Sequence, residues 1–134
     1  MTIFGIGVDV VENARIRQSM DRIGDPFLDR VFTPTEREYC DSMKFSERHY
    51  AARFAAKEAI AKAFGTGIGE NLGWKDMEIL RRESGEPFVV MSGSGKQFQR
   101  DRGICQIMIS LTHTDHYAAA NAVVCCEEKP SIDA

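Results

Sequence analysis

The chain has 134 residues, of which 43% are hydrophobic and 28% charged, and its formal net charge is −3. This length suits one domain with its own core, which we expect over residues 1–126, followed by a C-terminal tail over 127–134. The net charge argues against a nucleic-acid-binding protein, which usually carries a basic domain or stripe. Apolar runs are too short for a membrane helix and the N-terminus lacks an export pattern, so we expect no membrane partner.

The four cysteines do not form a C-x-x-C pair. A chain that can build a sizeable core needs no disulfide staples, so we expect reduced thiols and a cytoplasmic location. They are Cys40, Cys105, Cys125 and Cys126.

The first apolar run, Thr2–Val8, predicts a buried strand, in which Gly5 and Gly7 permit a neighbour to pack closely. Asp9 follows directly. Asp9 and Glu12 have the spacing of a capping box, which predicts that Asp9 caps a helix.

This first helix is expected to end near Met20. Asp9 has a second interpretation, because a carboxylate at a strand end beside a helix N-terminus is well placed to bind a metal. The local pattern favours capping.

Two short helices are predicted next. Asp25 and Pro26 are typical of a cap and a first helical position, and that helix runs to about Val31. Thr33 and Glu36 form a second capping box, which begins a helix through Met43.

The segment Arg53–Gly65 is rich in Ala, Lys, Glu and Phe and has no Pro, which predicts a helix. Ser46 is its expected N-cap, and Gly65 is suited to the left-handed residue that closes a helix. At helical spacing its alanines form one stripe that another backbone can approach closely. They are Ala52, Ala56, Ala59 and Ala63.

The bulky face of this helix also carries charges, although it looks buried. Unpaired buried charge is costly, so such residues usually pair, extend to solvent, or meet a ligand or metal. A surface pair between Glu58 and Lys62, four residues apart, is the simpler interpretation of those two residues.

The second half of the chain alternates glycine-rich turns with β-branched runs, which predicts hairpins. Gly65–Gly69 fits a loop after the helix. Ser92 or Ser94 is expected to cap a short helix to about Arg102. The expected strands are Asp76–Arg82, Pro87–Met91, Ile104–Thr112 and Tyr117–Cys126, with His113–His116 as the last turn. The prediction is an α+β fold with helices packed on an antiparallel sheet.

Three separated segments match one pattern together: Gly5–Asp9 with Glu12 and Arg15, Arg53–Gly69, and Ile109–Thr114 followed by Tyr117–Ala120. The match extends through Phe32–Glu36 and Gly85–Pro87. In this order the motifs resemble the holo-acyl-carrier-protein synthases, the bacterial phosphopantetheinyl transferases.

The resemblance implies transfer of 4′-phosphopantetheine from coenzyme A to a serine of apo acyl carrier protein, for fatty acid biosynthesis, with Mg²⁺ required. The other product is adenosine 3′,5′-bisphosphate. Asp9 and Glu58 match the metal-binding and catalytic positions. The base for the serine hydroxyl is either Glu58 or a metal-bound water that Glu58 orients.

For coenzyme A, the resemblance implies that Lys62 and His113 contact its phosphates, with Arg53, Lys57 and Thr114 as further candidates. An alternative interpretation of Lys57 is a buried structural charge that pairs with a carboxylate. An alternative interpretation of His113 is a histidine that serves only the turn.

Acyl carrier protein is acidic, and the resemblance implies that it docks on the first helix, where Arg15 and Arg22 lie about two turns apart. Here the arginines alternate with Asp21, Asp25 and Asp29, which departs from the usual basic pattern. The resemblance also implies a homotrimer with sites between protomers. A non-catalytic coenzyme A or nucleotide-binding module and a carrier-binding scaffold are the competing hypotheses.

Overall fold

The computed structural model describes residues 1–128, so the predicted tail beyond Glu128 lies outside the described residues. The elements in chain order are β1 (Thr2–Glu12), α1 (Asn13–Arg22), α2 (Asp25–Val31), α3 (Pro34–Asp41), α4 (Ser46–Phe64), the 3₁₀ helix η1 (Trp74–Asp76), β2 (Met77–Arg81), β3 (Pro87–Met91), α5 (Gly93–Asp101), β4 (Ile104–His113) and β5 (Tyr117–Cys126). No helix within residues 1–128 combines the length and apolar character needed to cross a membrane.

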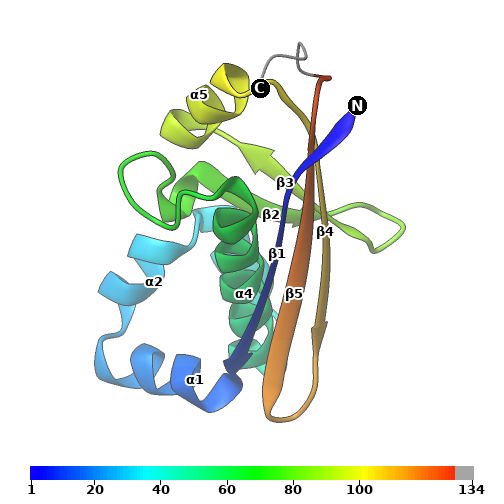
Figure 1. Cartoon of the computed structure of the whole chain (residues 1–134). Coiled ribbons are helices and arrows are strands. Elements are labelled where there is room, and N and C mark those ends of the chain that lie inside the picture. The colour runs from blue at the N-terminus through cyan, green and yellow to red at the C-terminus, as the bar shows by residue number, and fades with distance from the viewer. Residues whose placement is uncertain (129–134) are drawn as a thin grey trace.

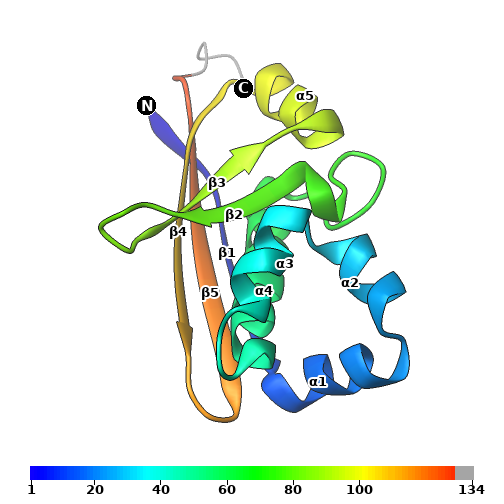
Figure 2. The same cartoon turned by 180° about the vertical axis from the view of Figure 1, so that it is seen from behind.

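Three long strands form an antiparallel sheet in the order β1-β5-β4, and β2 and β3 form a separate hairpin. Helix α4 lies along one face of the long sheet, with the other helices around its flanks and ends (Figure 1). Seen from behind, α3 and the β2–β3 hairpin pack beside α4 (Figure 2). The predicted α+β fold is confirmed.

The opposite face of the long sheet is apolar but open to solvent. On β1, Ile6, Val8 and Val10 are 70%, 61% and 61% exposed, and Met108 on β4 is 43% exposed. Such exposure is unusual for β-branched residues in the middle of long strands, and a contiguous exposed apolar patch typically marks an interaction surface.

Strand β1 and helix α4 are in backbone contact. A Cβ atom placed at Gly7 would lie 1.9 Å from the carbonyl oxygen of Ala59, and one at Gly5 would lie 2.0 Å from that of Ala63. The predicted close approach at the two glycines and at the alanine stripe is therefore confirmed. No other residue type fits at Gly5 or Gly7 without separating the strand from the helix.

The strand β1 is longer than the sequence predicts, and Asp9 does not cap a helix. Residues through Glu12 pair with β5, up to Glu12 opposite Tyr117, and α1 begins at Asn13 without a side-chain cap. The capping-box prediction failed because pairing with β5 satisfies the backbone around Asp9, and the local pattern contains no information on that partner strand.

The predicted caps have mixed outcomes. The Thr33 capping box is confirmed, with the Glu36 amide donating to Thr33 Oγ1 at 3.3 Å and the Thr33 amide donating to Glu36 Oε1 at 2.8 Å. The caps predicted at Asp25 and Ser46 are wrong, because each is the first residue of its helix. Gly65 closes α4 in the left-handed conformation, as predicted.

Ser92 occupies the N-cap position of α5, but its side chain makes no capping bond. Asp76 takes that role from η1, because its Oδ2 accepts from the Gly95 amide at 3.0 Å and from the Gly73 amide at 2.9 Å. One carboxylate therefore joins η1 to α5.

A buried ion pair joins four segments of the chain. Lys57 Nζ donates to Glu36 Oε1 at 2.7 Å and to the Val31 carbonyl at 2.7 Å, and neither charged side chain is exposed. Glu36 Oε2 also accepts from the Ile79 amide at 2.6 Å. The pair thus connects α2, α3, α4 and β2 at one point.

We expect Lys57→Met to lower the free energy of unfolding by about 3–5 kcal/mol, because it leaves a buried carboxylate without its cation. Urea denaturation followed by circular dichroism measures the loss. The matched control is Glu38→Gln, an exposed position on α3, which should change stability by no more than about 0.5 kcal/mol. Equal stability of Lys57→Met and wild type would contradict a structural role for the pair.

Candidate functional site

Two pockets flank α4 and share no lining residue. The carboxylate pocket, of about 310 Å³, includes Asp9, Arg15 and Glu58 in its lining. The basic pocket, of about 210 Å³, includes Arg53 and His113. The structure therefore divides the predicted site residues between two places in one chain.

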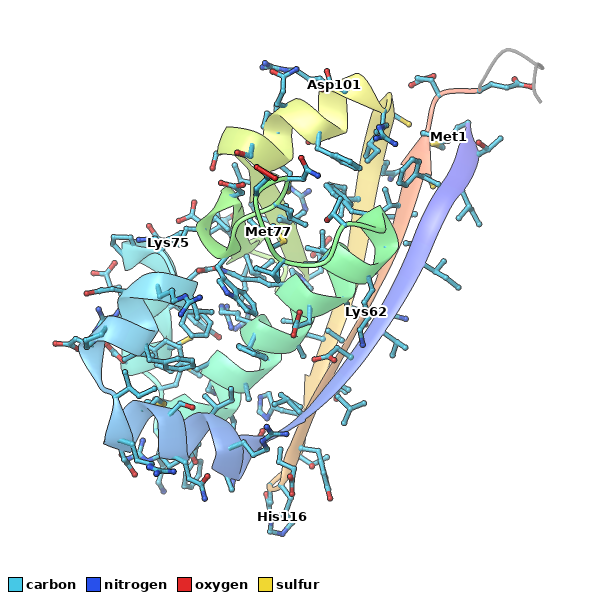
Figure 3. The ribbon with its side chains drawn as sticks, turned by 60° about the vertical axis from the view of Figure 1, so that its left-hand side comes forward. Met1, Lys62, Lys75, Met77, Asp101 and His116 are labelled. Atoms are coloured by element: carbon cyan, nitrogen blue, oxygen red, sulfur yellow. The ribbon has the colours of Figure 1, made fainter. Side chains whose placement is uncertain are left out.

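In the carboxylate pocket, Asp9 comes from β1 and Glu58 from α4. Lys62 lies one turn after Glu58 and reaches across to β1, where its Nζ donates to the Val8 carbonyl at 2.9 Å and to Asp9 Oδ1 at 3.2 Å. Figure 3 shows Lys62 on α4 beside the β1 ribbon. The interpretation of Glu58 and Lys62 as a simple surface pair is wrong, because Lys62 is bonded to Asp9.

The two carboxylates concentrate negative charge. Burial raises the pKa of Glu58, the nearby charge of Asp9 raises it further, and Lys62 acts in the opposite direction. Ionised Glu58 is thus less stable in this pocket than in water, and a bound cation would remove that penalty.

The two carboxylates, Asp9 and Glu58, fit a magnesium ion that is also bound by water and substrate better than they fit a metal bound by protein ligands alone. Within residues 1–128 there is no cluster of three or more His, Cys, Asp or Glu side chains that could hold a metal. Magnesium is commonly bound by one or two carboxylates together with water and substrate phosphates. Asp9 and Glu58 meet that requirement.

The basic pocket contains a buried arginine. Arg53 is 4% exposed, and its guanidinium donates to the His49 carbonyl at 3.5 Å and lies 4.4 Å from the centre of the Tyr39 ring. The Nε atom of Arg53 has no hydrogen-bond partner, and the guanidinium group forms no ion pair with a carboxylate in the described part of the chain. A buried guanidinium that borders a pocket under these conditions favours an anionic ligand.

His113 lies beside Arg53 in this pocket and packs against His49, with ring centroids 4.9 Å apart. The sequence analysis missed His49, Tyr39 and Arg81, which also line the pocket. One signal was available, since His49 lies four residues before Arg53 and therefore on the same face of α4. Tyr39 and Arg81 come from other elements, and only the tertiary structure brings them here.

Lys57 lies in neither pocket. Its position in the core, bonded to Glu36, supports the structural alternative and leaves it no route to a ligand within this chain. Thr114 closes the β4–β5 turn, where its Oγ1 accepts from the Tyr117 amide at 3.2 Å, and it is absent from the lining of the basic pocket. Arg22 is exposed at the far end of α1.

Asn13 is a structural residue of the site that the sequence analysis also missed. It is buried, and its Nδ2 donates to the carbonyls of Thr114 and Asp115 at 2.9 and 3.2 Å. The turn that follows His113 is thereby held against the start of α1.

The raised pKa of Glu58 predicts a stability change. A carboxyl whose pKa is raised by folding destabilises the fold when ionised, so its penalty is absent well below a glutamate's usual pKa of about 4.3 and grows as pH rises. Glu58→Gln should therefore raise the melting temperature of metal-free protein at neutral pH by about 1–3 °C, and this gain should vanish below about pH 4. Scanning calorimetry with a chelator tests this, with Glu38→Gln as the control. A lower melting temperature for Glu58→Gln at neutral pH would contradict it.

Known proteins share this arrangement of elements. The sequence of residues 5–122 matches the family model of the 4′-phosphopantetheinyl transferase superfamily. A holo-[acyl-carrier-protein] synthase of Ruminiclostridium cellulolyticum is 46% identical over 120 residues, which are 89% of this chain and 90% of that protein. One from Geobacter sp. is 42% identical over 122 residues, covering 91% and 98% of the two chains.

Solved structures of holo-[acyl-carrier-protein] synthases have the same fold as this chain. The Helicobacter pylori holo-[acyl-carrier-protein] synthase in complex with coenzyme A superposes with a TM-score of 0.81 at 32% identity, covering 90% of this chain and 99% of that one. The Neisseria meningitidis synthase gives a TM-score of 0.85 at 30% identity, covering 91% and 98%. The chain therefore belongs to the holo-[acyl-carrier-protein] synthases of the 4′-phosphopantetheinyl transferase superfamily.

Proposed function

We propose that this protein transfers 4′-phosphopantetheine from coenzyme A to a serine of apo acyl carrier protein, giving holo acyl carrier protein and adenosine 3′,5′-bisphosphate. The observation that carries the proposal is the Asp9–Glu58–Lys62 cluster, in a chain whose relatives have this activity in their names and include one solved with coenzyme A. Residues 1–126 form the catalytic domain in this proposal, and the product serves fatty acid biosynthesis.

The same proposal places the reaction in the cytoplasm. The four cysteines have free thiols, which suits a reducing compartment.

Asp9 and Glu58 are the proposed magnesium ligands. The metal would supply positive charge to the pyrophosphate of coenzyme A, whose cleavage leaves charge on the departing phosphate. Glu58 has a second proposed role as the base for the serine hydroxyl, directly or through a water that it orients. Its raised pKa brings it closer to neutrality, where a general base is most effective.

The proposed contacts to coenzyme A come from both pockets. Lys62 lies beside the carboxylates, and this position supports its proposed contact to the pyrophosphate. Arg53 and His113 are proposed to hold another phosphate in the basic pocket, since Arg53 lacks a carboxylate partner in residues 1–128. Thr114 and Lys57 remain as positioning residues of the turn and of α4 in this proposal.

The division of the site supports a homotrimer with sites between protomers. Asp9 lies on the β1 edge of the sheet, whereas His113 ends β4 on the opposite edge. If the β1 edge of one copy meets the β4 edge of the next, the carboxylate pocket and the basic pocket of two copies face one ligand. A head-to-tail contact closes into a ring of three when each copy is rotated by a third of a turn, and the exposed apolar face of the sheet would be covered inside that ring.

A non-catalytic coenzyme A-binding module is the second candidate, and the carboxylates distinguish the two. Such a module needs the basic pocket and Lys62 but has no use for the two adjacent carboxylates. A carrier-binding scaffold needs neither pocket.

Asp9→Asn should abolish transfer, because it removes the charge proposed to bind magnesium. The fold should remain intact, because Asp9 caps no helix and its backbone pairing with β5 does not depend on the side chain. Intact-protein mass spectrometry of apo acyl carrier protein, with coenzyme A and magnesium, measures the added phosphopantetheine on its serine. Partial rescue by raised magnesium or by manganese is expected. Transfer by Asp9→Asn at the wild-type rate would rule out the metal role, and absence of any adduct with wild type would rule out the enzyme.

Co-assembly of two inactive variants tests the proposed site between protomers. Asp9→Asn damages the carboxylate pocket and His113→Gln damages the basic pocket, so mixed trimers contain some interfaces with both intact halves. Each mixed trimer has one interface out of three with both halves intact, so the doubly tagged trimers should regain about a third of the sites. Differently tagged chains are co-expressed, and the doubly tagged trimers are assayed. Activity no higher than that of either parent would place the whole site within one chain.

Charge reversal at Arg15 and Arg22 tests carrier docking. Both are exposed on α1, and Arg15 also lines the carboxylate pocket. The double variant should raise the KM for the acidic carrier about tenfold and weaken its dependence on salt, because rim charges mainly govern encounter. The KM for coenzyme A should change less than the KM for the carrier, because only Arg15 of the two lines the carboxylate pocket. An unchanged KM for the carrier would move the docking surface elsewhere.

A further inference from the structure

His49 adds a second imidazole to the basic pocket. It lies on α4, partly buried, and its ring meets His113 of β4 edge-on at a centroid distance of 4.9 Å and Tyr39 of α3 at 5.9 Å. Two histidines in contact at a pocket with a buried arginine form an arrangement whose charge depends on pH.

The groups that face His49 are mostly cationic. They are Arg48 and Arg53 of α4, Arg81 of β2 and His113 of β4, with Tyr39 of α3 as the neutral neighbour. Arg48, one of these cations, is bonded to the carboxylate of Asp115 in the β4–β5 turn at 3.2 Å. Burial lowers the pKa of His49, and His113 and the arginines lower it further. Without a ligand, these neighbours therefore favour the neutral ring over the imidazolium.

We propose that His49 takes up a proton from solvent when a phosphate monoester enters the basic pocket, and then binds that phosphate as an imidazolium. The inference rests on the proposed function, because coenzyme A supplies the ligand. Its 3′-phosphate is a monoester that is mostly a dianion above about pH 6, whereas its pyrophosphate is not a monoester. No covalent bond is broken, and the proton moves from solvent to a ring nitrogen.

The direction of the pH dependence follows from charge. A dianion in the pocket reverses the local potential and raises the pKa of His49, so the complex binds more protons than the free protein. Affinity for coenzyme A should then increase as pH falls from about 8.5 to about 6.5, a range in which the monoester remains largely dianionic. Dephospho-coenzyme A lacks the monoester and should bind with little proton uptake.

Titration calorimetry in buffers of different ionisation enthalpy counts the protons taken up. Coenzyme A and dephospho-coenzyme A are the probes, and wild type is compared with His49→Gln and with His116→Gln. His116 is an exposed histidine of the same turn that does not line the pocket. For His49→Gln we expect less proton uptake and about tenfold weaker coenzyme A binding near pH 6.5, with a smaller loss near pH 8.5. His116→Gln should match wild type.

Three outcomes separate this inference from the proposed function. Unchanged proton uptake in His49→Gln, or equal uptake with both ligands in wild type, overturns the role of His49 and leaves phosphopantetheine transfer untouched. Normal proton uptake without transfer to the carrier overturns the proposed enzyme and supports His49. If His49→Gln does not fold, the imidazole pKa of wild-type His49, measured by NMR with and without coenzyme A, must rise on binding, and a constant value rejects the proposal.

Discussion

The backbone contact between β1 and α4 is the constraint on which the carboxylate pocket depends. It exists because Gly7 and Gly5 carry no side chain, so that the carbonyl oxygens of Ala59 and Ala63 can lie against the strand. At that separation Lys62 reaches the Val8 carbonyl, and Asp9 comes close enough to Glu58 to raise its pKa. A side chain at either glycine would separate the strand from the helix and the two carboxylates from each other.

Helix α4 also separates the carboxylate pocket from the basic pocket. Three of its charged residues point in different directions, so that Glu58 borders one pocket, Arg53 borders the other, and Lys57 lies in the core. The Glu36–Lys57 pair fixes the helix to α3 and β2 between these pockets. Buried hydrogen bonds of this kind support the position of each pocket on its side of the helix.

Both pockets retain electrostatic strain that binding would relieve. In one pocket, burial and the charge of Asp9 raise the pKa of Glu58. In the other, Arg53 is buried without a carboxylate partner in residues 1–128, and burial and the surrounding cations lower the pKa of His49. A protein selected only for stability would avoid placing like charges next to one another, whereas binding sites commonly keep them. The signs are complementary to a magnesium–pyrophosphate unit on one side and a phosphate on the other.

The sequence by itself determined the α+β class, the helix over 46–64, the Thr33 capping box and both hairpins, because these depend on local periodicity, capping and turn chemistry. It also predicted the close packing at Gly5 and Gly7. Only the tertiary structure decided that Asp9 lies within a strand, that Lys62 bonds to Asp9, and that Lys57 pairs with Glu36. Each of these depends on a partner at least 21 residues away in the chain, and local patterns carry no information about such contacts.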